Sequence, residues 1–161
     1  MEKEVMVQKG KKILECVEKI KRTELSEIFG YTIGGLSDVI ADMEAIGKNL
    51  SQGYKPSRVA MALAVQNLEG FISLSDDIVR FIIDEAYVDM DKSNKHLDEF
   101  LEIVSCITEY TTILRDLEYG TLGLGIGGFI LGISRERVEQ MIEKYKRKIR
   151  QRIEEMRYKW R

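Results

Sequence analysis

A cluster of polar side chains that could contact DNA bases begins the last amphipathic stretch of the chain. Ser134 suits a helix N-cap, and the two turns after it hold long polar side chains. These are Arg135, Glu136, Arg137, Glu139 and Gln140. Arg and Gln can pair with guanine and adenine, and Glu can accept from cytosine. The basic residues that follow, suited to phosphates, are Lys144, Lys146, Arg147 and Lys148. The pattern predicts a helix that contacts double-stranded DNA.

The residues around this cluster meet the requirements of a helix-turn-helix. That motif needs a small residue where its two helices touch, a glycine in the turn and inward-pointing apolar residues on the second helix. Gly128 supplies the small residue and Gly132 supplies the turn. Val138 and Met141 fall at the inward positions of the second helix. We therefore predict a helix-turn-helix over residues 124–143.

The stretch "LGISRERVEQMIEKYKRKIRQ" resembles the last helix-turn-helix of bacterial sigma factors, their region four. The upstream "ILRDLEYG" resembles the helix that precedes it in that family, and the similarity covers about residues 107–152. The resemblance implies promoter-type DNA binding and transcription regulation, with RNA polymerase as a further candidate partner. One departure from the family is Glu139, which stands where an arginine is usual. A second is that Gly125, Ile126, Phe129 and Ile130 stand where the family has glutamates. No stretch resembles region two, so a complete sigma factor is not expected.

A glycine-rich run, "TLGLGIGGFI", occupies the place of the first helix of the motif. Each glycine costs a helix roughly 1 kcal/mol relative to alanine, so this helix should form only if it is packed on both sides. Its apolar residues Ile126, Phe129 and Ile130 would otherwise be exposed. We expect a two-fold homodimer to cover them, the alternative being the long helix expected at 97–118.

Two other functions remain open. Residues 119–134 are uncharged and precede many Lys and Arg residues, as in a membrane segment with a positive flank, although a spanning helix needs about 20 residues. Alternatively, the basic tail binds a protein partner or the acidic middle of its own chain. We favour the DNA-binding protein and expect no membrane association.

The charge is distributed unevenly along the chain. Its 161 residues have a net charge of −2, but residues 25–120 contribute −10 and residues 121–161 contribute +6. Such an asymmetry is typical of a protein whose basic end meets a polyanion. Hydrophobic residues make up 44% of the chain, which is enough for a core.

Apolar residues recur at helical spacing through most of the chain, which predicts an all-α bundle. The expected helices cover about 2–22, 24–29, 36–46, 56–70, 97–118 and 134–161, with a further helix capped by Ser75 and a polar connection at 89–95. Three units are expected: 1–52, with a weak helix-turn-helix pattern of its own, the acidic 53–104, and 105–161.

The remaining reactive residue types predict no catalytic site. Cys16 and Cys106 fall at apolar positions and suit buried thiols, and the only histidine, His96, is expected to be exposed. They offer no metal-ligand spacing and no nucleophile–base pair, so we expect neither an enzyme nor a cofactor. The charged N-terminus does not resemble a signal peptide, which predicts a cytoplasmic protein.

Overall fold

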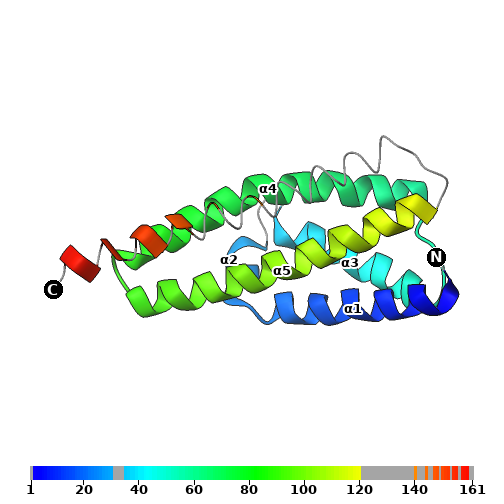
Figure 1. The fold of residues 1–161 in the computed structure, drawn as a ribbon, viewed down its shortest axis with the longest axis horizontal. Coiled ribbons are helices and arrows are strands. Elements are labelled where there is room, and N and C mark those ends of the chain that lie inside the picture. Colours follow the sequence, from blue (N-terminus) through cyan, green and yellow to red (C-terminus); the bar gives the residue numbers. More distant parts are fainter. Residues whose placement is uncertain are drawn as a thin grey trace.

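In a computed structural model of the protein, residues 2–30 and 35–120 form a bundle of five helices (Figure 1). The structure also describes positions 140, 144, 147, 148, 150–152, 154, 155 and 157–159. The helices are α1 (Lys3–Lys21), α2 (Glu24–Phe29), α3 (Leu36–Ser51), α4 (Arg58–Ala86) and α5 (Met90–Gly120). These described residues contain no strand, which confirms the all-α prediction. The helix-turn-helix predicted at 124–143 lies outside them, apart from Gln140.

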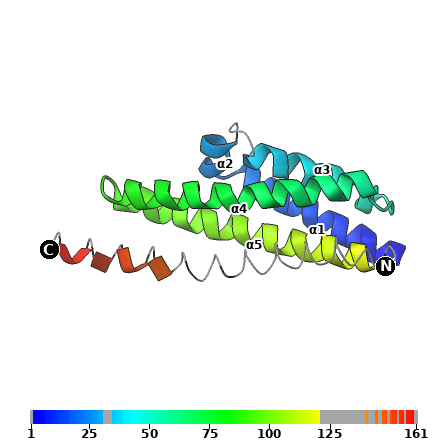
Figure 2. The same cartoon turned by 90° about the horizontal axis from the view of Figure 1, so that it is seen from above.

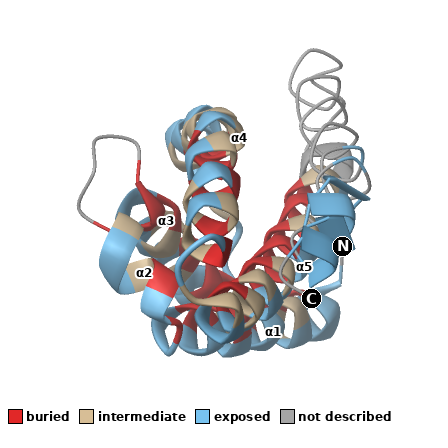
Figure 3. Ribbon diagram, turned by 90° about the vertical axis from the view of Figure 1, so that its left-hand side faces the viewer, coloured by how far each residue is buried: buried red, intermediate tan, exposed pale blue. Residues whose placement is uncertain are grey.

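The helices form two antiparallel pairs. α1 packs chiefly against α3, while α4 and α5 run side by side as a long hairpin (Figure 2). The pairs stack through contacts of α3 with α4 and of α1 with α5, and the short α2 lies against α5. Seen end-on, the buried residues face the interior between the helices (Figure 3).

The α1–α3 pair is held by an unusually close approach of the two backbones. A Cβ atom built on Gly10 would lie 2.3 Å from the Ser51 nitrogen and 2.7 Å from the Gly47 oxygen. Only glycine at position 10 therefore permits this spacing. After α3 and its C-cap Gln52, Gly53 adopts a φ of 81°. Ser57 then caps α4 by accepting from the Ala60 N–H at 3.1 Å.

The prediction that Ser75 opens a new helix was wrong. α4 is one helix of 29 residues that continues through Ser75, and Ser75 is fully buried within it. Its hydroxyl donates to the Phe71 carbonyl one turn earlier at 2.8 Å. A serine whose hydroxyl donates to a carbonyl of the preceding turn can lie in the middle of a helix, so Ser75 does not mark a helix start.

The polar connection predicted at 89–95 was also wrong. α5 begins at Met90, and the Asp89 carboxylate accepts from the Lys92 N–H at 3.1 Å, as an N-cap does. Ser93 is buried and donates to the Ile82 carbonyl of α4 at 2.7 Å, closing the hairpin. Because α5 is continuous to Gly120, the expected boundary between residues 104 and 105 falls inside one helix.

Candidate functional site

Four of the ten residues predicted to contact DNA are described by the structure. Gln140, Lys144, Arg147 and Lys148 are all helical and exposed. Steps of four, three and one residues place these side chains along one side of a helix. The other six, Ser134, Arg135, Glu136, Arg137, Glu139 and Lys146, lie outside the described residues.

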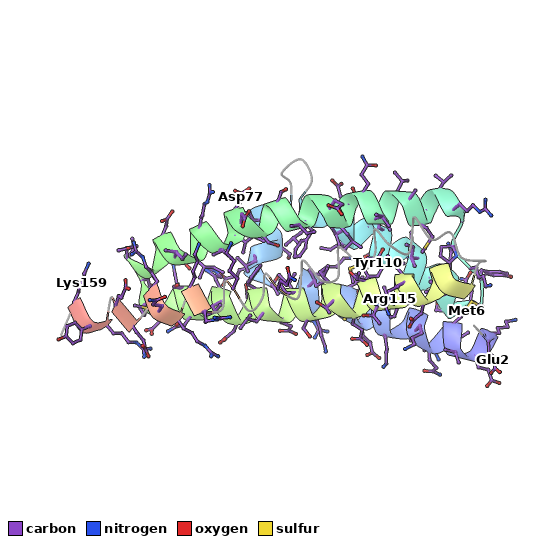
Figure 4. All side chains as sticks on the ribbon, turned by 45° about the horizontal axis from the view of Figure 1, so that its top comes forward. Glu2, Met6, Asp77, Tyr110, Arg115 and Lys159 are labelled. Carbon is purple, nitrogen blue, oxygen red and sulfur yellow. The ribbon has the colours of Figure 1, made fainter. Side chains whose placement is uncertain are left out.

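Basic residues continue toward the C-terminus beyond this group. The twelve positions described between 140 and 159 include seven Lys or Arg and two Glu, and all twelve are exposed. We call residues 140–159 the basic segment. Figure 4 shows Lys159 at the end of the molecule opposite Glu2, beyond the turn between α4 and α5. Positive charge is thus carried at that end, whereas residues 25–120 carry a net −10.

One described contact joins the basic segment to the bundle. The Arg152 guanidinium carbon lies 5.2 Å from the centre of the Tyr87 ring, which follows the last residue of α4. Arg152 also pairs with Glu155 at 3.8 Å, and both of these side chains are about half exposed. A cation over an aromatic face is an attractive contact, so this point of the segment lies against the α4 end of the hairpin.

A second polar site, which the sequence analysis missed, surrounds His96. The prediction that this histidine is exposed was wrong, because only 2% of its surface is accessible. Its Nδ1 contacts Glu85 Oε1 of α4, and its Nε2 lies 2.9 Å from Glu24 Oε2 of α2. Glu24 also pairs with Lys95. The imidazole therefore bridges α2, α4 and α5.

The charges around His96 favour its protonated form. Burial lowers the pKa of His96, but hydrogen bonds to the Glu24 and Glu85 carboxylates outweigh it, so the pKa lies above its usual 6.5. Hydrogen bonds from Lys95 and then His96 lower the pKa of Glu24 to about 2. Protonated His96 can donate from both ring nitrogens, one to each carboxylate.

The polar contacts of His96 with Glu24 and Glu85, which we call the His96 clamp, hold helices α2, α4 and α5 together. Both ring nitrogens are engaged, so neither is available as a catalytic base or a metal ligand in this arrangement. Among the side chains that the structure describes, no three His, Cys, Asp or Glu residues are placed to hold a metal ion. Glu99 extends the clamp by accepting from the N–H groups of Glu24 and Leu25, each at 3.2 Å.

A signal for the burial of His96 was present in the sequence. His96 precedes Phe100 by four residues and Ile103 by seven, so it lies on the buried stripe of α5. Its partners carry no such signal, since Glu24 is 72 positions away and comes from another helix.

A third polar group joins α3 to α4 near a buried tyrosine. Asn67 of α4 donates to the Asp42 carboxylate of α3 at 2.5 Å. Burial raises the pKa of Asp42, although this hydrogen bond opposes the shift. Tyr110 of α5 points into the interior, where burial and the charge of Asp42 raise the pKa of its hydroxyl (Figure 4).

No family model, curated protein or solved structure matches this chain. The resemblance to sigma region four therefore stays a prediction from the residues themselves. Within residues 2–30 and 35–120, no helix is both long and apolar enough to cross a lipid bilayer. The run at 119–134, on which the membrane alternative depended, lies largely outside the described residues.

Proposed function

We propose that the protein binds double-stranded DNA through its C-terminal part, with the helical bundle as the scaffold that carries it. The observation that carries this proposal is the density of exposed cations on the basic segment, where seven Lys or Arg occur among twelve described positions. Neutralising DNA phosphates releases condensed counterions, which drives binding by any surface of this kind. The helix-turn-helix pattern at 124–143 supports DNA as the polyanion.

The two groups of side chains have different roles in this proposal. Ser134, Arg135, Glu136, Arg137, Glu139 and Gln140 lie at the start of the recognition helix and contact base edges or the adjacent backbone. Lys144, Lys146, Arg147 and Lys148 contact phosphates. The acidic residues of 25–120 repel DNA, so the duplex approaches the C-terminal part alone. Transcription regulation as a homodimer, with RNA polymerase as a candidate partner, belongs to the same proposal.

The test is a salt titration of binding to a fluorescent DNA duplex, with two variants of equal charge. Arg147→Ala/Lys148→Ala removes two exposed cations that the proposal places on phosphates, and Lys11→Ala/Lys48→Ala removes two from the bundle surface. Each phosphate contact contributes about 0.9 to the slope of log affinity against log salt. We expect the first variant to lower the slope by about 1.8 and the second to leave it unchanged.

Two results would contradict the proposal. One is the absence of binding by the unaltered protein at about 50 mM salt, where the counterion contribution is large. The other is an equal loss of slope in both variants, because net charge alone would then explain the binding.

A second candidate function is favoured by the contact of Arg152 with Tyr87. Here the basic segment is a helix that docks on protein, either on the acidic bundle of its own chain or on an acidic partner. The same titration distinguishes the candidates. If the segment binds only protein, adding this protein will not change the fluorescence anisotropy of the DNA duplex.

A further inference from the structure

The two cysteines of the chain meet across the bundle. Cys16 of α1 and Cys106 of α5 are 90 positions apart in the sequence, and both are buried with free thiols. The two thiols lie close enough for each to shift the pKa of the other, upward for Cys16 and downward for Cys106. The sequence predicts only that each thiol is buried, because the spacing within one helix does not reveal which residue of another helix lies opposite.

An ion pair on the surface of the same two helices supports this alignment independently. Lys12 Nζ of α1 lies 3.7 Å from Glu109 Oε1 of α5. Lys12 precedes Cys16 by about one turn, and Glu109 follows Cys106 by about one turn. α1 and α5 run in opposite directions (Figure 1). The Lys12–Glu109 contact therefore places position 16 of α1 opposite position 106 of α5.

The contact between the thiols joins the two halves of the bundle. α1 belongs to the pair with α3, and Cys106 belongs to the α4–α5 hairpin. The chain itself links these halves only through residues 52–57. A covalent bond between Cys16 and Cys106 would therefore hold together two units that otherwise stack through side-chain contacts.

We propose that Cys16 and Cys106 are a modification site at which a peroxide forms a reversible disulfide between α1 and α5. In the first step the Cys106 thiolate attacks one oxygen of hydrogen peroxide, giving a sulfenic acid and releasing hydroxide, which takes up a proton to become water. In the second step the Cys16 sulfur attacks the Cys106 sulfur, the S–O bond breaks, and the departing hydroxide takes the Cys16 proton and leaves as a second water. Two thiols and one peroxide thus give one disulfide and two waters.

The surroundings of the pair favour Cys106 as the sulfur that attacks peroxide. The neighbouring Cys16 thiol lowers the pKa of Cys106 despite its burial. The charge of Lys19 lowers it further, while the charges of Glu102 and Glu109 oppose the shift. The neighbouring Cys106, together with burial, raises the pKa of Cys16, which keeps its proton. The thiolate is the reactive form, and because only 5% of the surface of Cys106 is accessible, the proposal needs an oxidant as small as hydrogen peroxide.

The test uses the folded, full-length protein treated with a small excess of hydrogen peroxide, followed by mass spectrometry and thiol titration after unfolding. We expect the intact mass to fall by two hydrogen atoms, both thiols to disappear and a dithiol reductant to restore them. A peptide pair containing Cys16 and Cys106 should appear in a non-reduced digest. The thermal midpoint should rise by roughly 5–15 °C on oxidation, because the bond closes a long loop.

Two single variants, Cys16→Ala and Cys106→Ala, provide matched controls, since neither can form the internal bond and neither should gain thermal stability on oxidation. The mass measurement on the unaltered protein stands alone if either variant fails to fold. Three results would overturn the proposal: two thiols that persist after peroxide treatment, a bond between two chains instead of within one, or oxygen addition without cross-linking.

Discussion

The bundle and the basic segment differ in how they use their side chains. In α1 to α5 large apolar residues form a buried core, and single polar residues such as Ser93 and His96 are buried with their partners. In the basic segment every described position is exposed, from Gln140 to Lys159. The charges are also opposite, with −10 over residues 25–120 and +6 over residues 121–161.

The difference indicates where substitutions should have their effects. A change inside the bundle removes packing or leaves a polar group without its partner, so it should appear as a loss of folding stability. A change on an exposed cation removes little packing, so it should appear in binding to a charged partner. Three experiments test this difference between the bundle and the basic segment, beginning with the largest expected effect.

The largest effect on folding stability should follow Gly10→Ala, which changes the packing inside the bundle. The new methyl group would overlap the backbone of α3 at Ser51 and Gly47, so α1 and α3 must move apart. Overpacking against the backbone should cost about 2–4 kcal/mol in the free energy of unfolding. Urea denaturation followed by circular dichroism measures this change.

The matched control is Lys11→Ala, at the next position on α1 but with an exposed side chain. Its free energy of unfolding should change by less than about 0.5 kcal/mol. A similar small change for Gly10→Ala would mean that α1 and α3 are not in backbone contact.

An intermediate effect should follow His96→Gln, and it should depend on pH. Because the folded pKa of His96 is raised, its contribution to stability is complete below the usual value of 6.5 and is lost as pH rises through the raised value. The unaltered protein should therefore lose stability above neutral pH. At about pH 5 the variant should be about 1–2 kcal/mol less stable, because Glu85 loses its charged partner.

The acidic limb of the same pH profile is the internal control. The pKa of Glu24 is lowered from 4.5 to about 2, so its contribution is present above 4.5 and is lost as pH falls toward 2. Lys95 still pairs with Glu24 in the His96→Gln variant, so most of this limb should remain. If the loss of stability above neutral pH also remained, the protonation of His96 would not be its cause.

The fold was predictable where one helix determines its own pattern. The helices at 3–21 and 24–29 were predicted closely, because their apolar residues recur at regular spacing and Gly30 ends the second. The third was predicted to end at Gly47, but α3 continues to Ser51, and Gly47 packs against Leu14 of α1 instead of ending the helix. Ser75 was predicted to be an N-cap because a serine before two aspartates is typical of a helix start. The buried stripe of α4 nevertheless passes through Ser75 without interruption, from Phe71 to Ile82.

The sites were less predictable because they depend on contacts between helices. The pairs His96–Glu24 and Cys16–Cys106 join residues 72 and 90 positions apart, and the relative alignment of the helices decides which residues meet. Periodicity within one helix gives the buried face but not the residue opposite. The predicted DNA-contact residues depend on local motif and charge instead, and the structure places four of them on exposed helical positions.

The smallest effect concerns the contact of Arg152 with Tyr87, where the two regions touch. A cation–π contact at this exposed position should contribute about 0.5–1 kcal/mol to the stability of the folded chain. The test is a double-mutant cycle of Arg152→Ala and Tyr87→Ala, with the free energy of unfolding measured for each variant. The control cycle replaces Arg152→Ala with Arg150→Ala, a nearby exposed arginine. Coupling should occur only in the first cycle. Zero coupling in both cycles would mean that Arg152 does not contact Tyr87. The basic segment would then be independent of the packed bundle at this point.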